Sequence, residues 1–309
     1  MSEQKTIPNV LKFVFGASAG MGATCFVQPL DLVKNRMQLS GVGGKPKEYR
    51  STLHAIQVIV QKEGVFSLYN GLSAGLLRQL TYTGTRLGVY TYLLDNFKSA
   101  DGTPPGFVGK LLMGMVAGGC GAFVGTPAEV SLIRMTADGR LPLEERRNYK
   151  NVGDALVRIY REEGLVTLWR GAIPTMGRAV AVNAAQLSTY SQAKQLIVEY
   201  VHMRDGIPLH FVSSMISGLI TTIVSMPLDI GKTRLQNMKT VNGVPEYKGL
   251  VDVLGRVVRN EGLFALWKGF LPYYLRLGPH TVLTFVFLEQ MNAAYYKYVL
   301  GEKGSRGGL

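Results

Sequence analysis

The chain has 309 residues, of which only 18% are charged and 47% are hydrophobic, a balance that disfavours an ordinary soluble domain, where roughly 25% are charged. Its mean hydropathy of +0.12 is too low for wholly apolar helices, so we expect helices with one lipid-facing and one polar face. The net charge of +13 requires an anionic partner, and nucleic acid, anionic lipid and anionic solutes all qualify.

The N-terminal segment MSEQKTIPNV has neither the basic start and apolar run of a secretory signal nor the Arg-rich pattern of a transit peptide. Cys25 and Cys120 lie in apolar, glycine-rich stretches without metal or disulfide spacing. We interpret both cysteines as packing residues.

Three copies of one pattern follow, about 100 residues apart. Each has a proline with an acid two residues later, then a Glu-Gly pair, then an aromatic residue two places before a glycine. The prolines are Pro29, Pro127 and Pro227, and the last glycines are Gly71, Gly171 and Gly269. The pattern predicts a single transmembrane domain over 1–309, with repeats at about 8–100, 106–200 and 206–300 and a polar tail at 301–309.

Each repeat predicts two spans with a surface helix between them. The first spans are expected before the prolines, at 10–27, 107–125 and 209–225, and the second after the glycines, at 72–94, 172–197 and 270–299. Each is about long enough to cross a bilayer. Between spans, segments such as 52–61 carry apolar residues at helical spacing, typical of a helix lying on a membrane. The predicted fold is therefore all-α, with six tilted transmembrane helices, short surface helices, pseudo-threefold symmetry and both termini on one side.

The prolines are expected to kink their helices, because each removes a backbone hydrogen bond. Charged residues follow them, and ions inside a span are costly unless they are paired or hydrated. Two arrangements remain open: acids and bases three residues apart pair within one helix, or they pair between neighbouring helices in a ring that closes one end. The residues concerned are Asp31, Lys34, Glu129, Asp229 and Lys232, with Leu132 at the position of the second repeat's base.

An arginine stands seven residues beyond each of the three glycines: Arg78, Arg178 and Arg276. At 1.5 Å per residue all three lie about 10 Å into their helices. A guanidinium group binds a carboxylate through two parallel hydrogen bonds, so three around one cavity predict a site for a small dianionic carboxylate. Because these helices have few acids in their middles, pairing with carbonyls or snorkelling is the weaker interpretation. Further site residues on the same faces are Tyr82, Arg86, Asn183 and Gln186, and His280 is interpreted as a packing residue or a minor site contact.

The triple Px[DE]xx[KR] pattern, with its EG and [WY]xG companions, resembles the mitochondrial carrier family over about residues 10–300. The resemblance implies alternating access, an inner-membrane location, and both termini toward the intermembrane space. It also implies a matrix-side gate in which Lys34 pairs with Asp229 and Lys232 with Glu129, braced by Gln38 and Gln236 with Thr136 substituting in repeat 2. Because Leu132 replaces a base, we expect Asp31 to lack its partner and the gate to hold two bridges.

The resemblance further implies a cytosolic gate on the second helices. Its positions here are Tyr90, Tyr190, Ser191, Lys194, Glu289 and Asn292. Few of these can form charge pairs, so we expect a weak gate, unless Asp95 and Lys98 of the neighbouring turn contribute. The family also implies cardiolipin at Gly71, Gly171 and Gly269, where backbone N–H groups at helix starts suit phosphate.

The resemblance, carried by segments such as QPLDLVKNRMQLSG and RLGPHTVLTF, further implies exchange of 2-oxoglutarate for malate or related dicarboxylates by antiport, with the monomer as the functional unit. The alternatives are a dicarboxylate/phosphate exchanger and an uncoupler-like anion or proton carrier. A nucleic-acid partner is disfavoured because the basic residues recur within apolar spans. The sequence has no P-loop, dinucleotide or metal-ligand motif, so we expect no enzyme, cofactor or metal.

Overall fold

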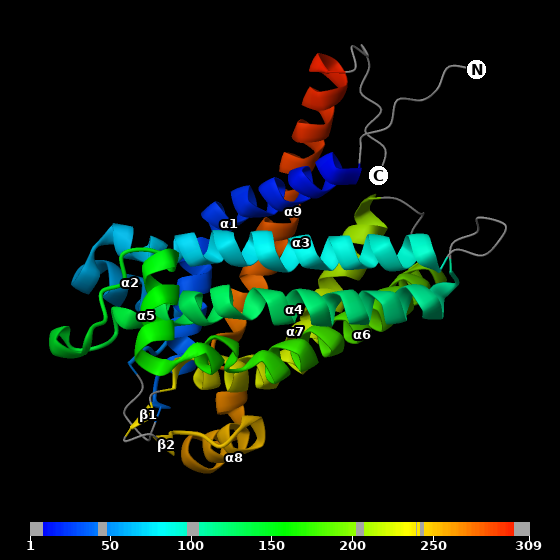
Figure 1. Cartoon of the computed structure of the whole chain (residues 1–309). Coiled ribbons are helices and arrows are strands. Elements are labelled where there is room, and N and C mark those ends of the chain that lie inside the picture. The colour runs from blue at the N-terminus through cyan, green and yellow to red at the C-terminus, as the bar shows by residue number, and fades with distance from the viewer. Residues whose placement is uncertain are drawn as a thin grey trace, which may run out of the picture.

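The computed structural model describes residues 9–42, 48–97, 105–201, 207–238, 240–241 and 244–299. Six long helices form the bundle in this part of the chain (Figure 1). They are α1 (Asn9–Leu39), α3 (Leu72–Asn96), α4 (Phe107–Asp138), α6 (Ala172–Leu196), α7 (Ile207–Asn237) and α9 (Phe270–Tyr298). The prediction of an all-α fold with six long helices is confirmed.

Three short helices lie at one end of the bundle, and a 3-10 turn follows each of them. The helices are α2 (Thr52–Glu63), α5 (Val152–Glu163) and α8 (Leu250–Glu261), and the turns are η2 (Val65–Tyr69), η4 (Leu165–Trp169) and η6 (Leu263–Trp267). Side chains of Ser51 and Asn151 cap α2 and α5 by accepting from backbone N–H groups three residues on. Smaller elements are η3 (Leu143–Glu145), the π-turn η5 (Ile197–Val201) and the hairpin of β1 (Thr240–Val241) and β2 (Val244–Pro245).

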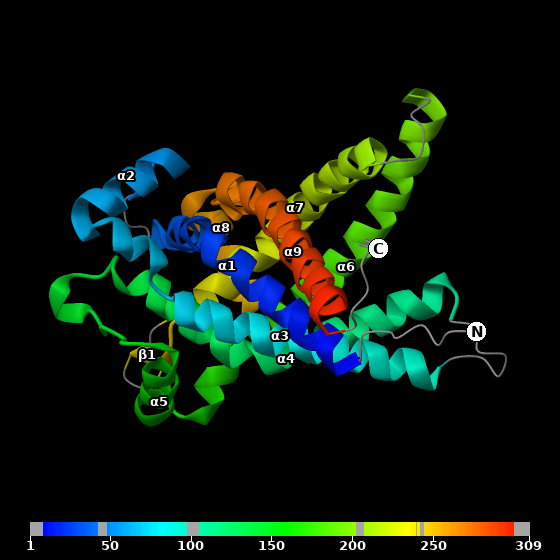
Figure 2. The same ribbon diagram turned by 90° about the horizontal axis from the view of Figure 1, so that it is seen from above.

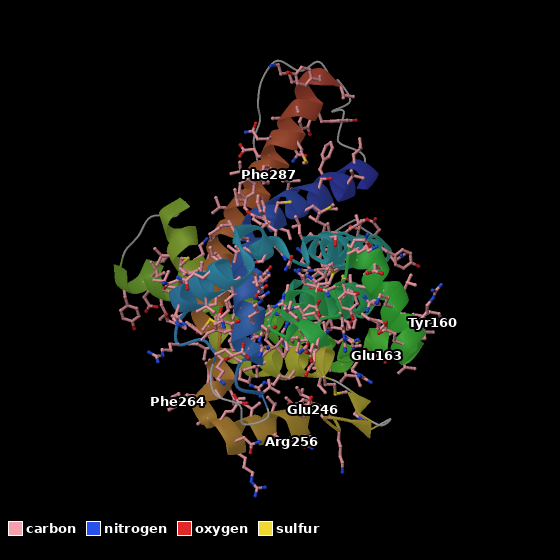
Figure 3. All side chains as sticks on the ribbon, turned by 90° about the vertical axis from the view of Figure 1, so that its left-hand side faces the viewer. Tyr160, Glu163, Glu246, Arg256, Phe264 and Phe287 are labelled. Carbon is pink, nitrogen blue, oxygen red and sulfur yellow. The ribbon has the colours of Figure 1, made fainter. Side chains whose placement is uncertain are left out.

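The long helices follow one another around a ring, and α9 returns to pack against α1. We call the end with α2, α5 and α8 the gate end, and the end with the first turn of α1 and the last turn of α9 the terminal end (Figures 1 and 2). Seen toward the gate end in Figure 3, Phe264 and Tyr160 point away from the bundle. In each repeat the 3-10 turn likewise exposes a large apolar side chain: Phe66, Val166 and Phe264.

The prolines lie inside α1, α4 and α7, as expected. These helices run beyond the apolar stretches 10–27, 107–125 and 209–225 to Leu39, Asp138 and Asn237. A proline inside a helix leaves the carbonyl four residues earlier without its N–H donor. In the third repeat the Nε1–H of Trp267 donates to that carbonyl, of Ile223, at 3.1 Å. Contacts from neighbouring elements therefore let the helix continue beyond the proline.

Two of the helices are long and apolar enough to cross a membrane by composition alone, over Val108–Asp138 in α4 and Val212–Asn237 in α7. The other four are long enough to cross a bilayer at 1.5 Å per residue. Polar residues lower the hydropathy of these four, as in α3, where Arg78, Tyr82 and Arg86 recur at helical spacing. This mixture accounts for the intermediate mean hydropathy of the whole chain.

Candidate substrate site and gate

Ionisable residues just beyond the helix prolines meet at the gate end. Lys34 of α1 forms an ion pair with Asp229 of α7, and Lys232 Nζ lies 2.8 Å from Glu129 Oε1 of α4. All four side chains are almost completely buried. Both pairs join different helices, although Lys232 also lies 3.7 Å from Asp229 of its own helix. Of the two arrangements left open by the sequence, the ring between helices therefore dominates.

Two glutamines contact these ion pairs. Gln38 Nε2 donates to Asp229 Oδ2 at 2.8 Å, and the side-chain Oε1 of Gln38 accepts from Thr233 Oγ1 at 2.8 Å. Gln236 Nε2 lies 3.4 Å from Glu129 Oε2. In the second repeat Thr136 Oγ1 accepts from Asn35 Nδ2 at 3.3 Å. Each contact joins two repeats, so the glutamines and the threonine extend the network that closes this end.

Asp31 has a partner, contrary to expectation. It forms an ion pair with Arg276 of α9, one of the three predicted substrate-binding arginines. Leu132 is 6% exposed and packs in an apolar cluster with Ala74, Met135 and Ala155, so it supplies no charge. The acid whose lysine is missing is therefore neutralised from deeper in the bundle, since an unpaired ion there would be costly.

The predicted site arginines also differ from expectation in their surroundings. We expected few acids near them, but acids reach them from the first helix of other repeats: Asp31 pairs with Arg276, and Asp229 Oδ1 lies 3.5 Å from Arg178 Nε. Arg78, Arg178 and Arg276 each keep a buried Nε that has no hydrogen-bond partner among the described residues. Repulsion between the three cations is thus only partly relieved, and unused donors remain for an anion.

The other predicted site residues differ in how they are placed. Tyr82 is half-buried, and its backbone lies so close to α4 that a Cβ on Gly121 would stand 2.8 Å from the Tyr82 carbonyl. Arg86 is exposed. His280 is half-buried within electrostatic reach of Arg276, Asp31 and Arg78. The side chains of Asn183 and Gln186 lie outside the described part of the structure.

The sequence reasoning missed Tyr273, which is 6% exposed at the centre of this group. Its hydroxyl accepts from Arg178 Nη1 at 3.3 Å, and Lys34 Nζ lies 4.7 Å from its ring centroid. Arg276 Cζ lies 6.0 Å from the same ring. A cation over an aromatic face is stabilised electrostatically, so Tyr273 joins the gate to the arginines. Its place one helical turn before Arg276 was the available signal.

The sequence reasoning also missed the role of the Glu-Gly acids. In every repeat this acid binds the arginine seven residues beyond the proline with both carboxylate oxygens: Glu63 with Arg36, Glu163 with Arg134, and Glu261 with Arg234. Each arginine Nε donates to a carbonyl of the next repeat: Arg36 to Thr136 at 2.9 Å, Arg134 to Gln236 at 3.2 Å, and Arg234 to Gln38 at 3.3 Å. The signal was that both residues recur at fixed positions in all three copies.

These pairs perturb the acids of the surface helices. Burial alone would raise the pKa of Glu163, but hydrogen bonds and charge from Arg134 outweigh burial and lower that pKa. The pKa of Glu261 is lowered in the same way, with Arg234 and Lys268 opposing burial. These acids therefore stay ionised and hold α5 and α8 to the long helices.

Comparison with known proteins agrees with this architecture. The mitochondrial carrier protein model matches residues 5–101, 103–201 and 204–299. The chain belongs to the mitochondrial carrier family. It is 65% identical to the mitochondrial 2-oxoglutarate/malate carrier protein of Caenorhabditis elegans over 97% of both chains, and 65% identical to that of Homo sapiens over 96% of this chain and 94% of the other. It is 38% identical to mitochondrial uncoupling protein 5 of Arabidopsis thaliana, over 93% and 98%. This carrier is thus a multi-pass protein of the mitochondrial inner membrane, from a family of transporters.

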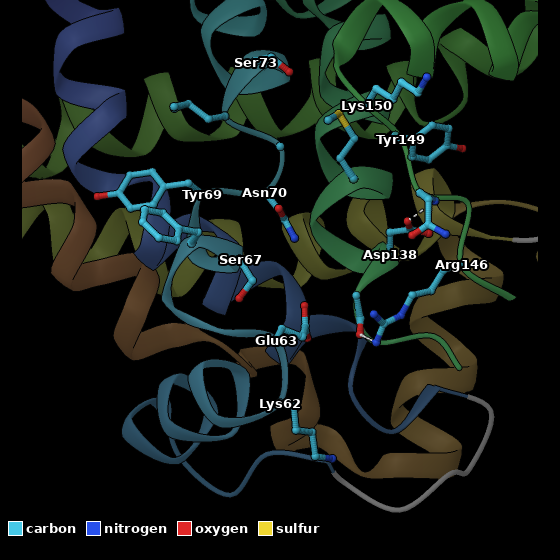
Figure 4. A pocket seen from close by; sticks show the side chains of 16 residues that line it. Lys62, Glu63, Ser67, Tyr69, Asn70, Ser73, Asp138, Arg146, Tyr149 and Lys150 are labelled. Carbon is cyan, nitrogen blue, oxygen red and sulfur yellow. Dashed lines mark hydrogen bonds between the residues drawn. The ribbon is translucent and has the colours of Figure 1, made fainter. Parts of the chain in front are cut away.

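A cleft of about 780 Å³ separates repeats 1 and 2 of the carrier at its gate end. Figure 4 shows Lys62, Arg146 and Lys150 around it, with Asn70 and Asp138 between them. Its wall includes Gly71, which precedes α3 with a left-handed φ of 84°. Gly171 and Gly269 precede α6 and α9 with φ of 85° and 82°. Because a left-handed φ favours glycine, the three equivalent helix starts depend on this residue.

At the terminal end the predicted second-gate residues are more accessible. Glu289 is exposed, while Tyr90, Tyr190, Lys194 and Asn292 are half-buried. The side chain of Ser191, and Lys98 altogether, lie outside the described residues. Figure 2 shows the terminal-end turns of α6 and α7 diverging from those of α1 and α9. In this structure the carrier is thus closed by ion pairs at the gate end.

Proposed function

We propose that this chain is an antiporter that exchanges 2-oxoglutarate for malate or related dicarboxylates across the mitochondrial inner membrane by alternating access. The observation that carries the proposal is the set of three arginines, Arg78, Arg178 and Arg276, each with a buried Nε that makes no hydrogen bond among the described residues. They come from the corresponding helix of each repeat and suit an anion with two carboxylates. The choice of 2-oxoglutarate and malate rests on the names of the relatives.

The acids near these arginines suggest how binding opens the gate. A substrate carboxylate that binds Arg276 competes with Asp31, and one that binds Arg178 weakens its contact with Asp229. Asp229 also pairs with Lys34, so a change at Arg178 reaches a gate ion pair directly. A ligand shifts a conformational equilibrium only through its different affinities for the two states. Competition for the arginines provides that difference, and without substrate the ion pairs keep the gate closed, which favours exchange over net transport.

We further propose that the gate end faces the matrix and that both termini face the intermembrane space. Within the single domain 1–309, lipid phosphate, as in cardiolipin, would bind the helix starts after Gly71, Gly171 and Gly269. The cleft beside Gly71 supports this binding, because three cations, Lys62, Arg146 and Lys150, line it with two acids, Glu63 and Asp138, and helix N-termini attract phosphate. Nothing in these contacts requires a second copy, so the monomer is the proposed functional unit.

Counterflow in liposomes tests the proposed substrates. Purified carrier is reconstituted with internal malate, and uptake of radiolabelled 2-oxoglutarate is measured against vesicles without internal substrate. We expect rapid uptake only with internal dicarboxylate. Phosphate-loaded vesicles and a proton-leak assay test the two alternative specificities. Exchange of malate for phosphate without 2-oxoglutarate uptake, or a proton leak without exchange, would overturn the proposal.

A further inference from the structure

The gate-end interface between repeats 1 and 2 lacks two cations that the equivalent interfaces have. Leu132 stands where the other repeats have Lys34 and Lys232, and Asn70 stands where they have Arg170 and Lys268. In the interface between repeats 3 and 1, Lys268 Nζ donates to the Ser40 carbonyl at 3.0 Å, in addition to the gate ion pair of Lys34 with Asp229. The interface between repeats 1 and 2, called the 1–2 interface below, has neither contact.

A different arginine crosses the 1–2 interface. Arg140, just beyond α4, binds both carboxylate oxygens of Glu48 in repeat 1, with Nε to Oε2 at 3.0 Å and Nη2 to Oε1 at 2.7 Å. Its Nη2 also donates to the Leu39 carbonyl at the end of α1, at 2.9 Å. The Arg140 side chain is 13% exposed and that of Glu48 is 40% exposed. Bidentate geometry distinguishes this pair from ordinary surface pairs, which contribute little.

The cation is particular to this interface. The positions equivalent to Arg140, counted from the prolines, are Val42 in repeat 1 and Thr240 in repeat 3. The only arginine at this position is therefore the one facing the interface that lacks the other two cations.

The turn that carries Arg140 is held firmly. Arg140 N donates to the Ala137 carbonyl at 3.1 Å, and the Gly139 carbonyl accepts from Arg146 Nη2 at 2.9 Å. A side chain on Gly139 would overlap the carboxylate of Glu63 and the guanidinium of Arg36. Because the turn packs this closely on the Arg36–Glu63 pair, Arg140 is positioned toward repeat 1 before it binds Glu48, which lowers the entropic cost of the contact.

We propose that the Arg140–Glu48 clasp replaces the missing lysine contact and holds repeats 1 and 2 together while the gate is closed. Arg140 is thus a positioning residue for gating that touches no substrate. The two interfaces with lysines have their ion pairs inside the bundle, whereas the ion pair of the 1–2 interface lies at its rim. Opening of the gate end separates Arg140 from Glu48, and loss of the clasp shifts the carrier toward that open state.

Cysteine labelling at the interface tests this inference without substrate. Asn35, 6% exposed and hydrogen-bonded to Thr136 across the 1–2 interface, is changed to Cys in a background with Cys25→Ser and Cys120→Ser. The rate of maleimide labelling in nanodiscs then reports opening of the interface. We expect Arg140→Gln or Glu48→Gln to raise the rate about fivefold, and the double variant to raise it no further. Arg140→Lys, which keeps the charge but not both hydrogen bonds, is expected to fall between parent and Arg140→Gln.

A second set of variants tests whether the clasp replaces the missing lysine contact or whether its loss only weakens the 1–2 interface in general. Adding Asn70→Lys or Leu132→Lys to Arg140→Gln should return labelling to within about twofold of the parent, since either lysine restores a contact that the other interfaces have. The control is Arg158→Gln, which removes an ordinary single-contact pair with Glu162 inside α5 and should leave labelling unchanged.

Labelling at the parental rate in both Arg140→Gln and Glu48→Gln would refute the claim that the clasp holds the 1–2 interface closed. Failure of both added lysines to lower the labelling rate would refute the claim that the clasp replaces a missing lysine contact. If one variant does not insert, the other removes the same pair from the opposite side. Labelling is measured without any dicarboxylate, so its result does not depend on the substrate specificity that the counterflow assay tests.

Discussion

The two ends of the bundle are built from the same six helices but are stabilised differently. At the gate end, buried acids and bases from different repeats pair, as Lys232 does with Glu129. At the terminal end, the helix ends diverge and Glu289, at a predicted gate position, is exposed. Removing one partner of a buried ion pair costs far more free energy than removing an exposed charge. The same kind of substitution should therefore impair the carrier more at the gate end than at the terminal end.

The largest effect is expected at the arginines that lie between the two ends. Arg178→Leu or Arg276→Leu should reduce dicarboxylate exchange by roughly 100-fold or more, because a buried, charge-assisted contact is lost. Uptake of labelled 2-oxoglutarate measures the effect, and membrane extraction shows whether the protein remains inserted. The matched control is Arg158→Leu on the surface helix α5. Near-normal transport by both variants would refute the site.

The next largest effect is expected at the gate end. Asp229→Asn removes the partner of Lys34 and weakens contacts with Lys232 and Arg178. Leaving a buried cation without its partner costs about 3–5 kcal/mol, so we expect a clearly lower unfolding temperature in detergent and impaired exchange. Asp252→Asn, at a carboxylate that pairs on the surface of α8 with Arg256, provides the control. Equal stability of the two variants would show that the gate does not depend on this acid.

Acid should weaken the gate end through its surface helices. The pKa of Glu261 is lowered in the folded carrier because Arg234 and Lys268 outweigh burial. A lowered pKa contributes stability above the unfolded value, near 4.5, and that stability is lost as the pH falls through the folded value. Thermal unfolding between pH 6 and 3.5 should therefore show a decline below about pH 4.5 that is smaller in Glu261→Gln. The same decline in both proteins would assign it to other groups.

The smallest effect is expected at the terminal end. Glu289→Gln should change exchange less than about fivefold, because surface ion pairs contribute at most about 1 kcal/mol. The initial rate of counterflow measures it, with Asp229→Asn as the comparison. A loss as large as that of Asp229→Asn would contradict the inequality of the two ends.

Helix starts were the best predicted feature of the fold, and contacts between helices the least. The second helices begin at Leu72, Ala172 and Phe270 as predicted, because a left-handed glycine before each start is readable locally. The first helices continue past Pro29 and its equivalents, as expected for prolines that kink a helix. No local signal reports the partner of the carbonyl that Pro227 leaves without a donor, which is Trp267 of the same repeat.

The candidate site could be predicted in kind but not in its pairing. The spacing from each glycine identified the arginines, because depth along a helix follows from residue number alone. That Asp31 uses Arg276 after losing its lysine to Leu132 depends on how α9 lies against α1. A single sequence does not show which residues of two packed helices lie side by side. The contact between Asp31 and Arg276 and the central place of Tyr273 were therefore visible only in the structure.

The three Arg–Glu pairs have a consequence for how the repeats move. Arg36, Arg134 and Arg234 each bind an acid of their own repeat and a carbonyl of the next, and the third carbonyl belongs to the first repeat. The contacts therefore run from repeat 1 to repeat 2, from repeat 2 to repeat 3 and from repeat 3 back to repeat 1, and form a closed ring. A displacement of one repeat is passed to the next, so we expect the three repeats to move together. This coupling does not depend on which repeat comes first in the sequence.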